Sequence, residues 1–149
     1  MAIYANAGTR LYVSSDLPAT NTQAGFEAVG IVWDEVSNVG NIGIPFDSFA
    51  EVSYQTLAGR RTQYAKGSID PGSLTAEMAY DPENDGQIML MDAHASDNAY
   101  SFKAVYTSGE IRYVQAKVFG MDQPAGGNDD VIVLNMSARP TDAVVKVLP

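Results

Sequence analysis

Residues Leu57–Ser96 decide the fold, and they read LAGRRTQYAKGSIDPGSLTAEMAYDPENDGQIMLMDAHAS. Within Leu74–Tyr80, every second residue is apolar, and Arg61–Lys66 alternates between two sides in a similar way. A period of two is typical of strands with one buried face. The SIDPGS link between them contains a Pro-Gly pair, which favours a tight turn with a positive φ at the glycine. The sequence therefore predicts two strands that fold back on each other as a hairpin.

A helix is predicted directly after this hairpin. Asp81 followed by Pro82 is typical of a helix N-cap with proline in the first turn. The apolar residues that follow are Ile88, Met89, Leu90, Met91, Ala93 and Ala95. We expect this helix to cover the apolar face of the strands.

Length and composition favour one domain that spans residues 1–149. The chain is 46% hydrophobic, which is enough for one core, and it is too short to make two domains the default. It has no cysteine, which excludes disulfides and thiolate metal sites. The start of the chain lacks the pattern of a signal peptide, and no run approaches the roughly 18 apolar residues of a membrane span. We expect no membrane association.

The charge balance bears on possible partners. Acidic residues outnumber basic ones by 18 to 9, which gives a net charge of −9. Such a surface is unsuited to gripping the phosphate backbone of a nucleic acid. The excess of negative charge is also compatible with simple solubility.

The remaining segments predict a mainly β fold with one main helix. Trp33 is expected to anchor the core, with short arms at about 1–8 and 140–149. Further strands are expected at Gly8–Ser15, Ile31–Val39, Ala99–Tyr106, Ile111–Phe119 and Val131–Arg139.

The segment Asn41–Ala58 is predicted to be an extended loop. It carries four large apolar residues that a plain loop would leave exposed, namely Phe46, Phe49, Val52 and Tyr54. They either pack on another molecule or fold back on the core of their own chain. Arg60, Arg61 and Lys66 follow as a basic cluster, which is either a solvated strand face or a contact for an acidic surface of an identical neighbour.

One motif with possible chemistry is present, and it is weak. Asp81–Asp92 resembles a calcium-binding EF-hand loop, with acids at positions 1, 3, 5 and 12 and Gly86 at position 6. Met89 supplies no oxygen at position 9, and a strand precedes the segment where the motif requires a helix, so a capped helix with an acidic first turn is the favoured interpretation. A monomeric β-sandwich module that binds calcium or a small ligand remains an alternative.

The sequence contains no combination of residues that is typical of a catalytic site. His94 is the sole histidine, and the sequence contains neither a GxSxG elbow nor a phosphate-binding glycine loop. We expect His94 at the C-terminus of the helix or in solvent, and we predict no enzyme activity, no cofactor and no metal. A small hydrolase that uses His94 is a further alternative.

Several segments together resemble the major tail tube protein of long-tailed bacteriophages of the lambda type. The likeness extends from Gly8 to Arg139 and is carried by GTRLYVS, PATNTQAGFEAVG, WDEVSNVGNIG, LAGRRTQYAKGSIDPGSLTAEMAYDPENDGQ and AYSFKAVYTSGEIRYVQAKVFG. The resemblance implies a β-sandwich or barrel-like subunit with a flanking helix, assembled into hexameric rings that stack into the tail tube of a virion. It implies no extra C-terminal domain, because the chain ends soon after Pro140.

The resemblance also implies partners and contact residues. The partners are other copies of the chain and the tape measure, tail terminator and tail tip proteins, and double-stranded DNA passes through the tube without specific binding. The inner tube of a contractile injection system is an alternative from the same structural class. Contacts between subunits are expected at Phe46, Phe49, Val52, Tyr54, Arg60, Arg61 and Lys66.

The acidity of the chain would allow DNA to pass through such a tube without binding to its wall. Six copies carry about −54 charges per ring, and a negative channel repels DNA phosphates so that the duplex slides without sticking. A ring of about 24 strands is wide enough to leave an open channel, and closing it removes exposed sheet edges. The candidate acids that line the channel are Asp34, Glu35, Glu77 and Glu110, because each lies on or beside a predicted strand.

Overall fold

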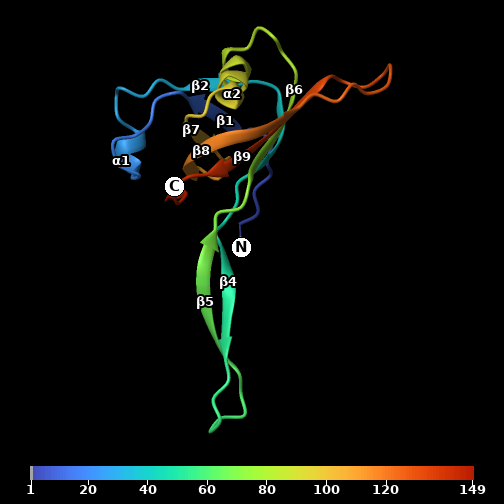
Figure 1. Cartoon of the computed structure of the whole chain (residues 1–149). Helices are drawn as coiled ribbons and strands as arrows, with labels where there is room; N and C mark the ends of the chain where they lie inside the picture. The colour runs from blue at the N-terminus through green and yellow to red at the C-terminus, as the bar shows by residue number, and fades with distance from the viewer. Residues whose placement is uncertain (1) are drawn as a thin grey trace.

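An eight-stranded antiparallel sheet forms the body of the molecule, and a separate two-stranded hairpin projects from it (Figure 1). The computed structural model describes residues 2–149. The strands of the body are β1 (Arg10–Ser14), β2 (Asp34–Val36), β3 (Val39–Gly43), β6 (Leu74–Ala79), β7 (Tyr100–Val105), β8 (Ile111–Asp122), β9 (Val133–Pro140) and β10 (Val145–Val147). The hairpin consists of β4 (Ser48–Tyr54) and β5 (Gln63–Asp70), and the helices are α1 (Gln23–Phe26) and α2 (Asp85–Ala95).

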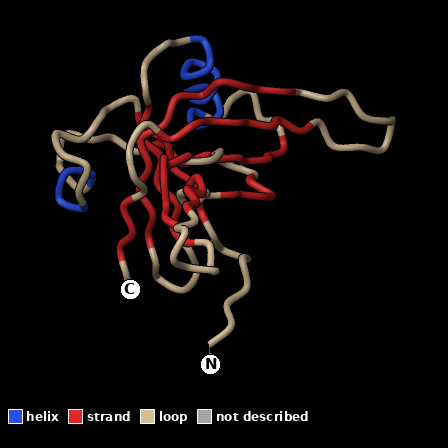
Figure 2. Tube along the Cα trace, turned by 60° about the horizontal axis from the view of Figure 1, so that its bottom comes forward, coloured by secondary structure: helices blue, strands red, loops and turns tan. Residues whose placement is uncertain are grey.

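The strand order in the body is β2-β1-β7-β8-β9-β6-β3, and β10 pairs with β8. Strand β8 is long enough to pair with β7 on one edge and with both β9 and β10 on the other. The sheet curves, so Leu11 of β1 and Leu74 of β6 belong to the same buried cluster (Figure 2). Helix α2 adds Leu90 and Ala93 to this cluster. The predicted class, mainly β with one main helix, is confirmed.

The alternating sequences predict the buried faces of the central strands well. Each sends its apolar residues into the core, as Phe102 of β7, Val114 of β8 and Met136 of β9 illustrate. Strands β7 and β8 form the predicted hairpin. Ile132 lies outside the core and is exposed.

The predicted hairpin between Arg61–Lys66 and Leu74–Tyr80 is wrong. Strand β5 pairs with β4, and β6 pairs with β3 and β9. The physical reason is burial. The apolar face of β6 is buried when β6 pairs with β3 and β9 in the body, whereas β5 has no apolar face to bury. Gly72 has the predicted positive φ, at +76°, but residues 71–73 form no tight turn and lead from the projecting hairpin into the sheet. The segment Asn41–Ala58, expected to be a loop, contains β4 and the end of β3.

Helix α2 begins later than predicted. Asn84 is its N-cap, because the Asn84 Oδ1 accepts a hydrogen bond from the Gln87 backbone N–H at 2.9 Å. Asp81 instead closes a turn, since its Oδ1 accepts from the Glu83 N–H. Of the predicted apolar surface, Leu90 and Ala93 are buried, Met89 and Met91 are partly buried, and Ile88 and Ala95 are exposed.

A buried glutamine joins this helix to the sheet. The side chain of Gln87 is fully buried. Its Nε2 donates to the carbonyls of Ser37, at 3.0 Å, and Ala79, at 2.9 Å, and its Oε1 accepts from the Asp81 N–H at 2.9 Å. These three bonds connect α2 to the β2–β3 turn and to the end of β6.

A smaller aromatic cluster lies outside the main core. Phe26 of α1 stacks on Tyr113 of β8 with ring centroids 4.9 Å apart, and Trp33 lies 6.0 Å from the same ring. Trp33 is therefore partly buried in this cluster and does not anchor the main core. Burial raises the pKa of Tyr113 to about 12, and the nearby Glu27 carboxylate adds to the effect.

Candidate functional site

The β4–β5 hairpin, Ser48–Asp70, projects from the body and is called the arm below (Figure 1). Every residue of β4 is exposed, and so is every residue of β5 except Gly67. Phe49, Val52 and Tyr54 expose 44%, 52% and 73% of their surface. An isolated two-stranded hairpin is only marginally stable in water. The arm therefore has the properties of a segment that another surface covers.

The register of the arm places side chains on two faces. Phe49, Lys66 and Ile69 lie on one face, where the Lys66 Nζ is 4.5 Å from the centre of the Phe49 ring. Val52 and Ala65 are paired on the other face. Both faces combine apolar and polar groups, as is usual for surfaces that bind another protein.

The end of the arm is basic. The turn of the arm, residues 55–62, contains Arg60 and Arg61 and no acidic residue, whereas Lys66 lies on β5 opposite Glu51. Leu57, in the turn between the strands, is fully exposed. Within residues 2–149, none of the three basic groups takes part in an ion pair.

The base of the arm is held by an arginine of the sheet. The Arg112 guanidinium lies 4.6 Å from the centre of the Phe46 ring, and its Nε donates to the Glu110 Oε1 at 2.9 Å. The Lys146 Nζ lies 3.6 Å from the same carboxylate oxygen. The hydrogen bond from Arg112 lowers the pKa of Glu110 below its ordinary value. Phe46 thus contacts its own chain, although much of its ring remains exposed.

A second set of contacts holds the other strand of the arm. The Arg139 Nη1 donates to the Gly72 carbonyl at 3.2 Å and lies 3.9 Å from the Asp70 carboxylate. Gly72 packs so closely on Pro45 that a Cβ would lie 2.8 Å from the proline Cβ. Both strands of the arm are therefore anchored where they leave the body.

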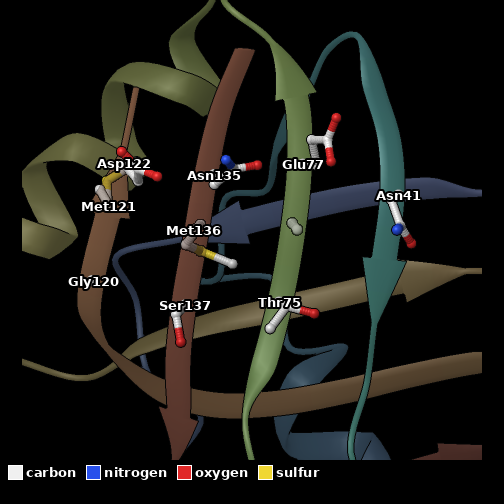
Figure 3. A pocket seen from close by; sticks show the side chains of 10 residues that line it. Asn41, Thr75, Glu77, Gly120, Met121, Asp122, Asn135, Met136 and Ser137 are labelled. Atoms are coloured by element: carbon white, nitrogen blue, oxygen red, sulfur yellow. The ribbon is translucent and has the colours of Figure 1, made fainter. Parts of the chain in front are cut away.

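A polar face of the sheet is the second candidate surface. Cross-strand pairing aligns Asn41 of β3, Glu77 of β6, Asn135 of β9 and Asp122 of β8 in one row. Thr75 and Ser137 are paired in the next row. These side chains border a depression of about 420 Å³ (Figure 3). The row contains two carboxylates and no basic group.

The structure separates the four acids that the sequence singled out. Glu77 belongs to the polar row, whereas Asp34 and Glu35 lie on β2 at the far edge of the sheet. Glu35 also lies 3.8 Å from Arg10. Glu110 is engaged with Arg112 and Lys146 in the β7–β8 turn. Sequence reasoning missed Asp122, because the strand was expected to end at Phe119.

The residues considered for catalysis and for calcium binding lie in and around α2. His94 is exposed in the last turn of α2. The last eight of the twelve residues in the calcium-like segment, from Asp85 to Asp92, are helical, so the segment does not wrap around a cation. Within residues 2–149, no group of three acidic or histidine side chains is placed to hold a metal ion. In the same range, neither helix has the length and apolar character needed to cross a bilayer.

No model of a known protein family matches the sequence, and no curated protein matches it. Solved structures match in fold. A chain of the SPP1 tail tube has a TM-score of 0.70 and 11% identity, with 99% of this chain and 80% of that chain covered. A chain of the anti-feeding prophage baseplate, 6-fold symmetrised, has a TM-score of 0.69 and 8% identity, with 99% and 98% covered.

A third similar structure comes from an extracellular contractile injection system. A chain of the PVC sheath–tube complex in the extended state has a TM-score of 0.65 and 12% identity, with 94% of this chain and 89% of that chain covered. The three likenesses span nearly the whole of this chain. They establish a shared fold across tail tubes and injection systems.

Proposed function

We propose that this chain is the structural subunit of a tail tube, and that its copies form hexameric rings that stack into a hollow channel for DNA. The observation that carries the proposal is the arm, which exposes apolar side chains on both faces and is anchored to the body at its base. An anchored, uncovered hairpin is suited to hold a neighbouring subunit. The proposed location is the tail of a virion, and the proposed role involves no catalysis.

Symmetry supports the ring. The similar chain of the anti-feeding prophage belongs to an assembly with 6-fold symmetry. The polar face of this chain spans four strands, β3, β6, β9 and β8, so six copies supply about 24 strands, enough for an open channel. Closing the ring also removes the free edge of β3.

We assign the polar face to the channel wall. Its row of Asn41, Glu77, Asn135 and Asp122 is anionic, and a wall of this kind repels DNA phosphates. Glu77 is thus retained as a channel acid and Asp122 is added. Asp34, Glu35 and Glu110 are weaker candidates, because β2 lies at the far edge of the sheet and Glu110 is already paired within its own chain.

The proposed contacts between subunits are Phe49, Val52, Tyr54, Arg60, Arg61 and Lys66, with Phe46 acting at the base of the arm. Tape measure, terminator and tip proteins are proposed as further partners of the tube. The lambda-type tail is the first candidate because of the sequence segments described above. The inner tube of a contractile system is the second, because the chain is similar in fold to one in the PVC sheath–tube complex.

Electron microscopy of the purified protein tests the proposal. We expect rings or tubes at high concentration. The matched control replaces residues 49–69 by Asn-Gly, since Ser48 and Asp70 are paired and a two-residue turn can join them. The control should stay folded and fail to stack. A wild-type protein that remains a monomer at every concentration would contradict the proposal.

A further inference from the structure

A second projection leaves the body at the end of β8 and returns into β9 (Figures 1 and 2). Residues Asp122–Ile132 are called the acidic loop below. They contain Asp122, Asp129 and Asp130 and no basic residue. Val131 and Ile132 expose 67% and 56% of their surface. The loop therefore combines negative charge with exposed apolar side chains.

The loop has internal order at its end. The Asp130 Oδ2 accepts a hydrogen bond from the Gly127 N–H at 2.7 Å, and the Asp130 N–H donates to the Gly127 carbonyl at 3.2 Å. These bonds hold residues 127–130 in a turn that contains Asp129 and Asp130. Among the ion pairs within residues 2–149, none includes Asp122, Asp129 or Asp130.

The charges of the acidic loop complement those of the arm. Asp129 and Asp130 lie near the end of the loop without a basic residue beside them, and Arg60 and Arg61 lie in the turn of the arm without an acidic residue beside them. These two neighbouring bases lie in a chain whose overall charge is −9. The partner that such a basic tip fits is an acidic protein surface, and copies of this chain supply one.

The two projections leave the body in different directions. In Figure 1 the arm extends downward from the body, and the acidic loop extends to the upper right. They do not meet within one copy, but the tip of one copy can reach the loop of another. Complementary surfaces at two different places on a molecule make a heterologous contact, which repeats without limit when it does not close. Stacking of rings is a contact of this kind.

We propose that the basic tip of the arm docks on the acidic loop of a second copy in the adjacent ring. Arg60 and Arg61 pair with Asp129 and Asp130, and Leu57 packs against Val131 and Ile132. The proposal rests on the proposed tube function and names the surface that receives the arm. It gives the stack a direction, because each ring presents tips on one side and loops on the other.

This pairing also serves the channel. Basic side chains that pair with a neighbouring subunit do not bind DNA phosphates. The assembled tube is therefore more uniformly repulsive to DNA than the free subunit. Because the paired groups lie at the surface, salt weakens the contact. Tubes should therefore dissociate as the salt concentration rises.

Charge reversal tests the pairing. Arg60→Glu with Arg61→Glu, and separately Asp129→Lys with Asp130→Lys, should each raise the subunit concentration needed for tubes by about tenfold or more. The chain that carries all four substitutions should assemble at nearly the wild-type concentration, because the complementary charges are restored in reverse. Sedimentation across a concentration series gives the threshold, and electron microscopy identifies the sedimented species.

The control reverses two exposed acids elsewhere, Glu83→Lys with Asp97→Lys, and should leave the threshold unchanged. Circular dichroism verifies that each variant is folded, which is expected because every substituted side chain is exposed. Wild-type-like assembly of both double variants, or no recovery in the fourfold variant, would overturn the pairing. A wild-type protein without tubes would instead overturn the proposed function.

Discussion

Replacing Gln87 by leucine should destabilise the fold far more than an average polar substitution. Leucine has a similar volume but makes none of the three side-chain hydrogen bonds. The change leaves the Ser37 and Ala79 carbonyls and the Asp81 N–H without their partner. An orphaned buried group costs about 1–3 kcal/mol. These three backbone groups belong to partly exposed residues, so the lower value applies and the total is about 3 kcal/mol.

Urea unfolding followed by circular dichroism measures this loss. A loss of about 3 kcal/mol lowers the folding equilibrium constant by roughly a hundredfold and the midpoint of thermal unfolding by about 6–12 °C in a domain of this size. The control is Gln123→Leu, since Gln123 is exposed and makes no side-chain hydrogen bond within residues 2–149. It should change stability by less than about 0.5 kcal/mol.

A second substitution separates hydrogen bonding from packing. Gln87→Glu keeps the shape but replaces the Nε2 donor by an oxygen that faces two carbonyls. Burial raises the pKa of the introduced carboxyl, so the loss of stability should be largest at neutral pH and should shrink as the pH falls and a donor is restored. If Gln87→Leu costs no more than Gln123→Leu, the buried glutamine does not join the helix to the sheet.

Three further predictions follow from the arm base and the aromatic cluster. Arg112→Met should lower the free energy of unfolding by about 1–2 kcal/mol and accelerate backbone hydrogen exchange at Phe46–Phe49, because the contacts to Phe46 and Glu110 are lost. The control is Arg10→Met, at an exposed site. Equal exchange rates in the two variants would refute the role of Arg112. The stability advantage of the wild type over Glu110→Gln should be present at neutral pH and should vanish as the pH falls through the lowered pKa of Glu110; an advantage that is independent of pH would contradict the ion pair. Burial raises the pKa of Tyr113 from 10.0 to about 12, so the wild type should lose stability relative to Tyr113→Phe as the pH rises from 10 to 12. A difference in unfolding free energy between the two proteins that stays constant over this range would refute the burial of the hydroxyl.

The alternation of apolar and polar residues predicts the central strands of this fold, because burial of one face of a strand requires an apolar residue at every second position. Strands β6 and β9 alternate apolar and polar residues, and each is buried on one face. Strand β5 lacks an apolar face, so its sequence does not specify a partner. The pairing with β4 depends on the exposed residues of Ser48–Tyr54, which sequence patterns class as a loop. Gln87 was missed because a polar residue in a helix is usually exposed, and only tertiary contacts reveal its three bonds.

The candidate surfaces are predictable in part. The arm residues were identified because large apolar groups and a basic cluster stand out in an interrupted segment. The polar row was missed because it combines β3, β6, β9 and β8, which are distant in sequence. Asp122 extends the outer face of β8 past an irregularity between Val118 and Gly120, where simple alternation fails. The charge complementarity of arm and acidic loop requires knowing that both project from the body.

The most direct test of the account is the end-on view of assembled protein by electron cryomicroscopy. The account predicts six-fold rings with an open channel, walls that present Glu77 and Asp122 inward, and the arm of each ring in contact with the next ring. A solitary monomer, or rings with the polar row on their outer surface, would contradict it.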